Sequence, residues 1–180
     1  MATEILVKSG TPVVWADTTD FSATLHGYTR THQIDLTSLA TTAARQGAKA
    51  DLGATRAERY AVRVGIEFDV APAIGATVDF YWSASFSATA ATGNDGGCTG
   101  ADAAYAAASE SEWLAQCIYM GSLIATADAA TVVQYATING GFRPPQRYGQ
   151  VLVRNATAQA FEGDAVEMFV ALIPIIDESQ

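Results

Sequence analysis

The side chains best suited to chemistry are two histidines, His26 and His32, which lie six residues apart on either side of Arg30. Imidazole and carboxylate groups are ligands that zinc prefers, and further carboxylates stand nearby in the sequence at Asp17, Asp20 and Asp35. A zinc site would require three or four ligands at fitting spacings, and no helical pattern brings the two histidines onto one face. We interpret these side chains as polar loop residues at a subunit contact and predict no metal site and no cofactor.

Two further motifs have an ordinary explanation as turns. The run Asn94-Asp95-Gly96-Gly97 is similar to part of a calcium loop, but the regular series of carboxylates and the closing glutamate are missing. Asn and Gly tolerate a positive φ, so the run is typical of a tight turn. Asn155-Ala156-Thr157 matches a glycosylation sequon, and we interpret it as a turn as well. No Gly-x-Ser-x-Gly nucleophile elbow occurs, and we expect no enzyme.

Aromatic stacking on a sugar is the remaining candidate chemistry, because the chain contains three tryptophans. Trp82 lies on the apolar side of an alternating segment and is predicted to be in the core. Trp113 follows a cap-like turn. Trp15 is therefore the best candidate for an exposed, sugar-stacking ring.

Composition excludes several classes of function. The 180 residues fit one domain, and a net charge of −9 disfavours binding to phosphate backbones, so no nucleic-acid partner is expected. No apolar run approaches the roughly 18 residues of a membrane span. Charged residues make up only 16% of the chain, whereas Ala contributes 35 residues and Thr 19. This composition is typical of a β-protein or of a surface covered by partners. We expect Cys98 and Cys117 to be free thiols, although one bridge is possible.

The elements that position these side chains are predicted to be strands. Residues 60–69 and 77–87 both alternate apolar and polar side chains, and a short Pro/Gly turn joins them. This pattern predicts an antiparallel hairpin with Val62, Val64, Val78, Phe80 and Trp82 among the residues that face one core. Other expected strands cover 4–9, 11–15, 33–36, 48–53, 118–127, 132–138, 149–155 and 164–176.

Nine or ten strands with little helix predict an all-β, antiparallel β-sandwich, jelly-roll-like, with residues 1–180 as a single domain. Two segments depart from the strand pattern. Residues 88–108 read as a long loop, and 109–116 as a helical turn with Ser109 and Glu112 at capping-box spacing.

The last predicted strand is apolar on both faces. Phe169, Ala171 and Ile173 lie opposite Val166, Met168, Val170 and Leu172. A sandwich normally solvates one face of each sheet, so this second apolar face must be covered. Either the 88–108 loop or another subunit is the expected cover. We favour the subunit and predict Phe169, Ala171 and Ile173 as interface residues. Pro174 is expected to place the end of the strand at an edge or rim.

Several stretches resemble a group of small structural proteins of tailed bacteriophages, and together the resemblance covers nearly the whole chain. They are 10–20 (GTPVVWADTTD), 33–39 (QIDLTSL), 43–49 (AARQGAK), 78–82 (VDFYW), 121–124 (GSLI), 142–149 (FRPPQRYG) and the closing stretch 164–178, from DAVEM through IDE. The group is defined by overall pattern and has no catalytic motif to carry over.

The resemblance implies a jelly-roll-like virion component, in particular a capsid decoration or cement protein that binds the major capsid protein and stabilises the shell. It further implies a homotrimer located on the virion and assembled in the host cytoplasm. The alternatives are a tail, baseplate or fibre-tip component and a jelly-roll carbohydrate-binding module.

Overall fold

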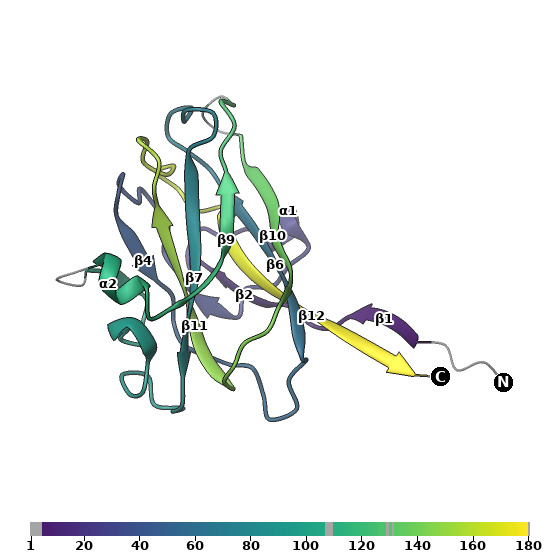
Figure 1. Cartoon of the computed structure of the whole chain (residues 1–180). Helices are drawn as coiled ribbons and strands as arrows, with labels where there is room; N and C mark the ends of the chain where they lie inside the picture. The colour runs from purple at the N-terminus through teal and green to yellow at the C-terminus, as the bar shows by residue number, and fades with distance from the viewer. Residues whose placement is uncertain (1–4, 107–109, 129, 131, 180) are drawn as a thin grey trace.

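The chain folds into two antiparallel sheets packed face to face (Figure 1). The computed structural model describes residues 5–106, 110–128, 130 and 132–179. No helix in these ranges is long and apolar enough to cross a bilayer. The predicted all-β sandwich is confirmed.

The first sheet, sheet A, has six strands. Their order is β10 (Gln134–Phe142), β6 (Arg59–Ile66), β12 (Phe169–Ser179), β2 (Val13–Ala16) and β3 (His32–Gln33), with β1 (Ile5–Ser9) paired to the end of β12. Its pairs are antiparallel except for the short β2–β3 pair.

The second sheet, sheet B, also has six strands. Their order is β8 (Ala103–Tyr105), β4 (Ala44–Gln46), β11 (Tyr148–Asn155), β7 (Thr77–Ser85) and β9 (Ile118–Ile124), with β5 (Ala50–Asp51) paired to β11. Of these, β4 and β8 were not expected from the sequence.

The strand order is that of a jelly roll. The eight principal strands, in chain order, are β2, β4, β6, β7, β9, β10, β11 and β12. In sheet A the first of these strands, β2, lies beside the last, β12, and in sheet B the second strand, β4, lies beside the seventh, β11. Successive strands mostly belong to different sheets. This arrangement of two Greek keys confirms the jelly-roll-like architecture.

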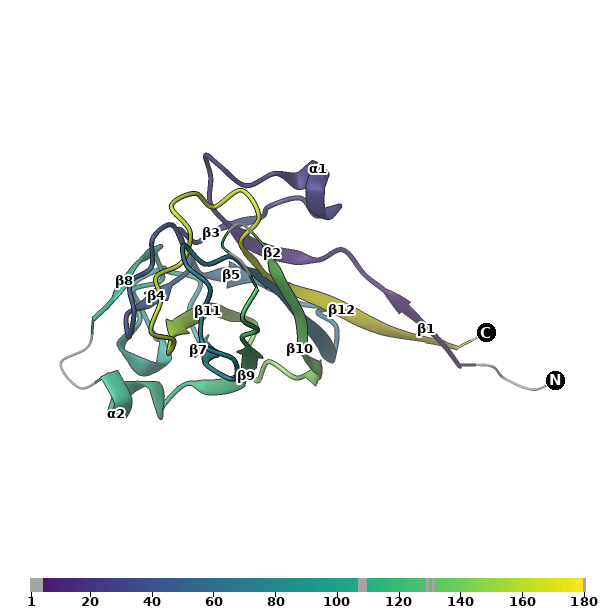
Figure 2. The same cartoon turned by 90° about the horizontal axis from the view of Figure 1, so that it is seen from above.

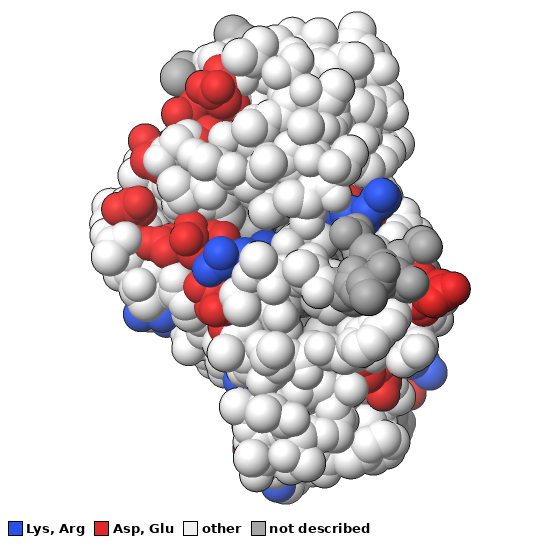
Figure 3. Space-filling view, turned by 90° about the vertical axis from the view of Figure 1, so that its left-hand side faces the viewer, with Lys and Arg blue, Asp and Glu red and all other residues white. Residues whose placement is uncertain are grey.

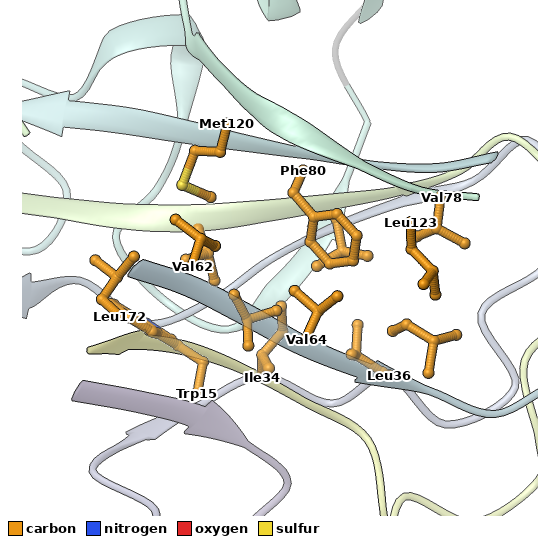
Figure 4. Packing of buried hydrophobic residues seen from close by; sticks show 14 of the residues in the cluster. Trp15, Ile34, Leu36, Val62, Val64, Val78, Phe80, Met120, Leu123 and Leu172 are labelled. Atoms are coloured by element: carbon orange, nitrogen blue, oxygen red, sulfur yellow. The ribbon is translucent and has the colours of Figure 1, made fainter. Parts of the chain in front are cut away.

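The predicted hairpin is wrong, because β6 and β7 lie in different sheets. β6 pairs with β10 and β12, whereas β7 pairs with β9 and β11. The Pro/Gly segment that joins them crosses from one sheet to the other. The predicted facing is nevertheless confirmed, since Val62 and Val64 meet Val78 and Phe80 across the core, and all four are fully buried (Figure 4).

The expected long loop at 88–108 is partly structured. It contains a short 3-10 turn, η1 (Asp95–Gly97), and β8, and it leads toward α2 (Glu110–Leu114). The expected helical turn is confirmed, although Ser109 of the predicted capping box lies outside the described residues. Cys98, Tyr105 and Leu114 from this segment pack with Ala44 and Leu152 of sheet B. The segment is therefore a cover for the outer face of sheet B.

Candidate interaction surface

The two histidines lie in separate aromatic contacts. The His26 ring stacks on Phe21, with centroids 5.3 Å apart, and the His32 ring lies 5.3 Å from that of Trp15. Burial lowers the pKa of both imidazoles. Across the described ranges, no group of three or more His, Cys, Asp or Glu side chains is arranged to hold a metal ion.

Asp17 has a structural role close to these histidines. Its carboxylate accepts hydrogen bonds from the backbone and side chain of Thr19 at 2.7 and 2.6 Å, from the Asp20 backbone, and from Gln33 Nε2 at 2.9 Å. Burial alone would raise the pKa of Asp17, but these bonds outweigh it and lower the pKa to about 2. Asp17 therefore holds a turn to strand β3.

The calcium-like run is a packing motif. Gly96 and Gly97 both have φ of 66°. A Cβ on Gly96 would lie 2.4 Å from Cys117 Sγ, and one on Gly97 would lie 1.3 Å from the Trp113 ring. The two glycines thus provide both the positive φ and the space that lets α2 and Cys117 close over η1.

Trp15 is not the exposed ring that the sequence suggested. It is fully buried, and its indole Nε1 donates a 2.7 Å hydrogen bond to the Ala48 carbonyl. The side chain belongs to the central core together with Trp82. Trp113 is the partly exposed tryptophan, at 37%.

The outer face of β12 is covered by a segment of the same chain. This segment is neither the 88–108 loop nor another subunit, the two covers expected from the sequence. Phe169 and Ala171 are 1% and 0% exposed, and Phe21 and Tyr28 pack over them. This cover runs from the end of β2 through α1 (Ala23–His26) and was predicted only as polar loop. Phe169 and Ala171 therefore lie in a buried cluster and not at a free surface. Ile173, the third predicted interface residue, is only partly buried.

A two-stranded arm projects from the sandwich beyond Ile173. Figures 1 and 2 show β1 and the end of β12 extending beyond the rest of the sandwich. β12 pairs with β6 as far as Ile175, opposite Arg59, and from there to Ser179 its partner is β1. We define the arm as Ile5–Ser9 together with residues 175–179.

Pro174 lies at the rim of the sandwich, as expected, but the strand does not end there. The Gly10 amide donates to the Pro174 carbonyl at 2.9 Å, so the proline nitrogen also points toward the connection between β1 and β2. The backbone N–H that Pro174 lacks would therefore point into the gap between β2 and β1, where β12 has no neighbouring strand on that side.

The arm carries apolar side chains that are partly exposed. Leu6 and Ile176 lie on the side that faces the core in the rest of sheet A, and their exposed fractions are 42% and 36% because sheet B does not extend this far. Val7, on the other side, is 64% exposed. An isolated two-stranded ribbon is marginally stable in water, so these surfaces are suited to a protein partner.

Two ion pairs involve the arm. Lys8 Nζ lies 2.8 Å from Glu178 Oε2 between the two strands, and Arg59 NH2 lies 2.6 Å from Asp177 Oδ1. The second pair joins the arm to the first residue of β6. Partly exposed pairs of this kind contribute little free energy.

One side face of the sandwich is sparsely charged. Figure 3 shows the face formed around β4, β8 and α2, where acidic side chains outnumber basic ones and most of the area carries neither. This agrees with the net charge of −9 and gives the face little attraction for polyanions.

A shallow hollow lies beside α2 on sheet B. Its lining includes Tyr81, Tyr119, Cys117 and Arg154. The two tyrosine rings are 5.4 Å apart, and Tyr119 is 54% exposed. Sequence reasoning missed this hollow because its residues come from segments that are distant in the chain.

Comparison with known proteins gave no matching family model, no matching curated protein and no matching solved structure.

Proposed function

We propose that this chain is a structural component of a virion, and specifically a decoration protein that binds the outer surface of the major capsid protein shell and stabilises it. The projecting arm carries the proposal. It extends one sheet beyond the sandwich, presents unpaired strand edges, and exposes Leu6, Val7 and Ile176. Exposed edges and apolar side chains are the chemistry by which strands add to another protein.

The side chains first considered for chemistry support a structural role. Asp17 holds a turn, His32 packs on Trp15, and the Asn94–Gly97 run seats Trp113. The jelly roll occurs in viral capsid proteins and also in lectins, so the fold alone does not choose between these classes. The resemblance of the sequence to structural proteins of tailed phages favours the virion.

Self-assembly is part of the proposal. Local threefold axes on a capsid exterior make a homotrimer the natural unit. Multi-angle light scattering of the purified chain at micromolar concentration is expected to report a trimer. A monodisperse monomer would contradict the trimer, and the chain would then attach to the shell as a monomer.

The arm makes the proposal testable with matched variants. Leu6→Asp and Ile176→Asp place a charge on the arm, whereas Ile74→Asp changes a side chain that is 81% exposed elsewhere on the sandwich. Purified phage heads that lack the chain would be mixed with each variant and sedimented.

We expect the arm variants to remain in the supernatant while the wild type and Ile74→Asp pellet with the heads, because burying an unpaired charge is costly. Equal pelleting of all four would contradict a role for the arm. Failure of the wild type to bind heads would contradict the decoration function itself.

The tyrosine-lined hollow favours carbohydrate binding as the second candidate. Stacking on exposed aromatic rings is a common mode of sugar recognition, and Tyr119 provides such a ring, packed against the partly buried Tyr81 beside Arg154. A glycan array would test it: binding that is lost in Tyr119→Ala would support this function, and no binding by the wild type would exclude it.

A further inference from the structure

Two cysteines that the proposed function does not use lie together under the cover of sheet B. Cys98 follows η1 and Cys117 follows α2, and their exposed fractions are 6% and 9%. Both belong to the cluster that includes Tyr105, Leu114 and Leu152, and both are free thiols. Cys117 Sγ packs against Gly96, two residues before Cys98, and donates a 3.8 Å hydrogen bond to the Trp113 carbonyl. The folded chain therefore brings together two sulfurs from opposite ends of the covering segment.

The surroundings shift the pKa values of the two thiols in opposite directions. The hydrogen bond with Cys117, together with bonds from Ser83 and Gln150, lowers the pKa of Cys98 although burial opposes this. The same contact with Cys98, together with burial, raises the pKa of Cys117. The thiolate is the reactive form of cysteine, and the hydrogen bonds around Cys98 favour that form there.

Small reagents have a route to the pair. Cys117 lines the hollow beside α2 together with Leu114, Tyr81 and Tyr119. The Cys117 sulfur is closely packed: any side chain at Gly96 would overlap it. A compact oxidant fits such a site better than a bulky disulfide does.

We propose that Cys98 and Cys117 are an oxidation site at which hydrogen peroxide forms a reversible disulfide, and that this bond closes the segment between them into a loop over the outer face of sheet B. One of the two sulfurs, as its thiolate, attacks one oxygen of the peroxide, the O–O bond breaks, and that cysteine becomes a sulfenic acid as the leaving oxygen takes a proton. The other sulfur then attacks the sulfenic sulfur, forms the S–S bond and releases water. Two thiols lose two electrons, and the peroxide is reduced to two molecules of water.

The bond would add a covalent link to a cover that β8–β4 pairing and the Arg45–Asp102 ion pair already join to sheet B. It closes a loop that contains β8 and α2, and a loop of this size stabilises a fold mainly by restricting the unfolded chain. The chain would then be made with free thiols in a reducing cell and become more stable in oxidising surroundings. This inference does not depend on the proposed function.

The test compares the reduced full-length chain before and after hydrogen peroxide. We expect the intact mass to fall by two hydrogen atoms, and a non-reducing peptide map to join the Cys98 and Cys117 peptides. The melting temperature should rise by about 4–10 °C, and dithiothreitol should reverse both changes. Cys98→Ser and Cys117→Ser are the controls, and neither should gain stability from peroxide.

Three results would overturn the inference. They are two thiols that remain free after peroxide, oxidation to sulfinic acid or to an intermolecular bridge without the internal link, and a link that leaves the melting temperature unchanged. The mass and the peptide map are read on the wild type, so the inference can still be tested if a serine variant fails to fold.

Discussion

Replacing Phe169 by alanine separates the two explanations of the doubly apolar last strand. The side chain is 1% exposed, and its ring lies 5.1 Å from that of His26 and 5.5 Å from that of Tyr28. Phe→Ala in a core costs about 3–5 kcal/mol. We expect about 3 kcal/mol here, because the covering residues are themselves partly exposed and can close some of the cavity.

The assay is urea unfolding of the free chain at low and at high micromolar concentration. If the cover is internal, Phe169→Ala lowers the free energy of unfolding by the same amount at both concentrations. The matched control is Val7→Ala on the arm, where the side chain is 64% exposed and the expected loss is below about 1 kcal/mol. A loss for Phe169→Ala that grows with protein concentration would refute the internal cover and restore Phe169 as an interface residue.

Three further predictions concern stability. Gly97→Ala should destabilise the chain by at least about 1 kcal/mol in thermal unfolding, because its Cβ would lie 1.3 Å from the Trp113 ring at a φ of 66°; Gly140→Ala, with open space around the Cβ, should be nearly neutral. Asp17 has a pKa of about 2 in the folded chain and 3.8 as its ordinary value, so it contributes about 2 kcal/mol to the free energy of unfolding; this contribution is complete above pH 4 and is lost as the pH falls toward 2. In an acid titration, the Asp17→Asn variant should lose stability less steeply than the wild type, and equal slopes for the two would contradict this. Lys49 Nζ lies within 3.0 Å of Ser85 Oγ and of the carbonyls of Ser87, Thr89 and Thr92, so Lys49→Met should speed amide exchange across the 86–93 turn, whereas Lys8→Met should leave that turn unchanged.

Alternation in the sequence predicts which side chains face the core but not which strands are neighbours. The two-residue period of β6 and β7 places Val64 and Phe80 correctly, and it is equally compatible with a hairpin or with strands in opposite sheets. The ten-residue connection 67–76, longer than a tight hairpin needs, was the available signal for a crossover between the sheets.

Long-range packing explains the other differences. The cover over Phe169 comes from a segment without periodic hydrophobicity, and its anchors Phe21 and Tyr28 stand singly among polar residues. The arm joins residues from opposite ends of the chain, which no local pattern reveals. Gly96 and Gly97 predict a turn from the sequence, but the close approach of Trp113 and Cys117 to these glycines depends on the tertiary fold.

The most direct test of the central claim is a cryo-electron microscopy reconstruction of the phage particle that contains this chain. The account predicts density for the jelly roll on the outer surface of the head, around local threefold axes, with the β1–β12 arm in contact with the shell. Density for the chain on the tail or baseplate, or a head surface without it, would contradict the account.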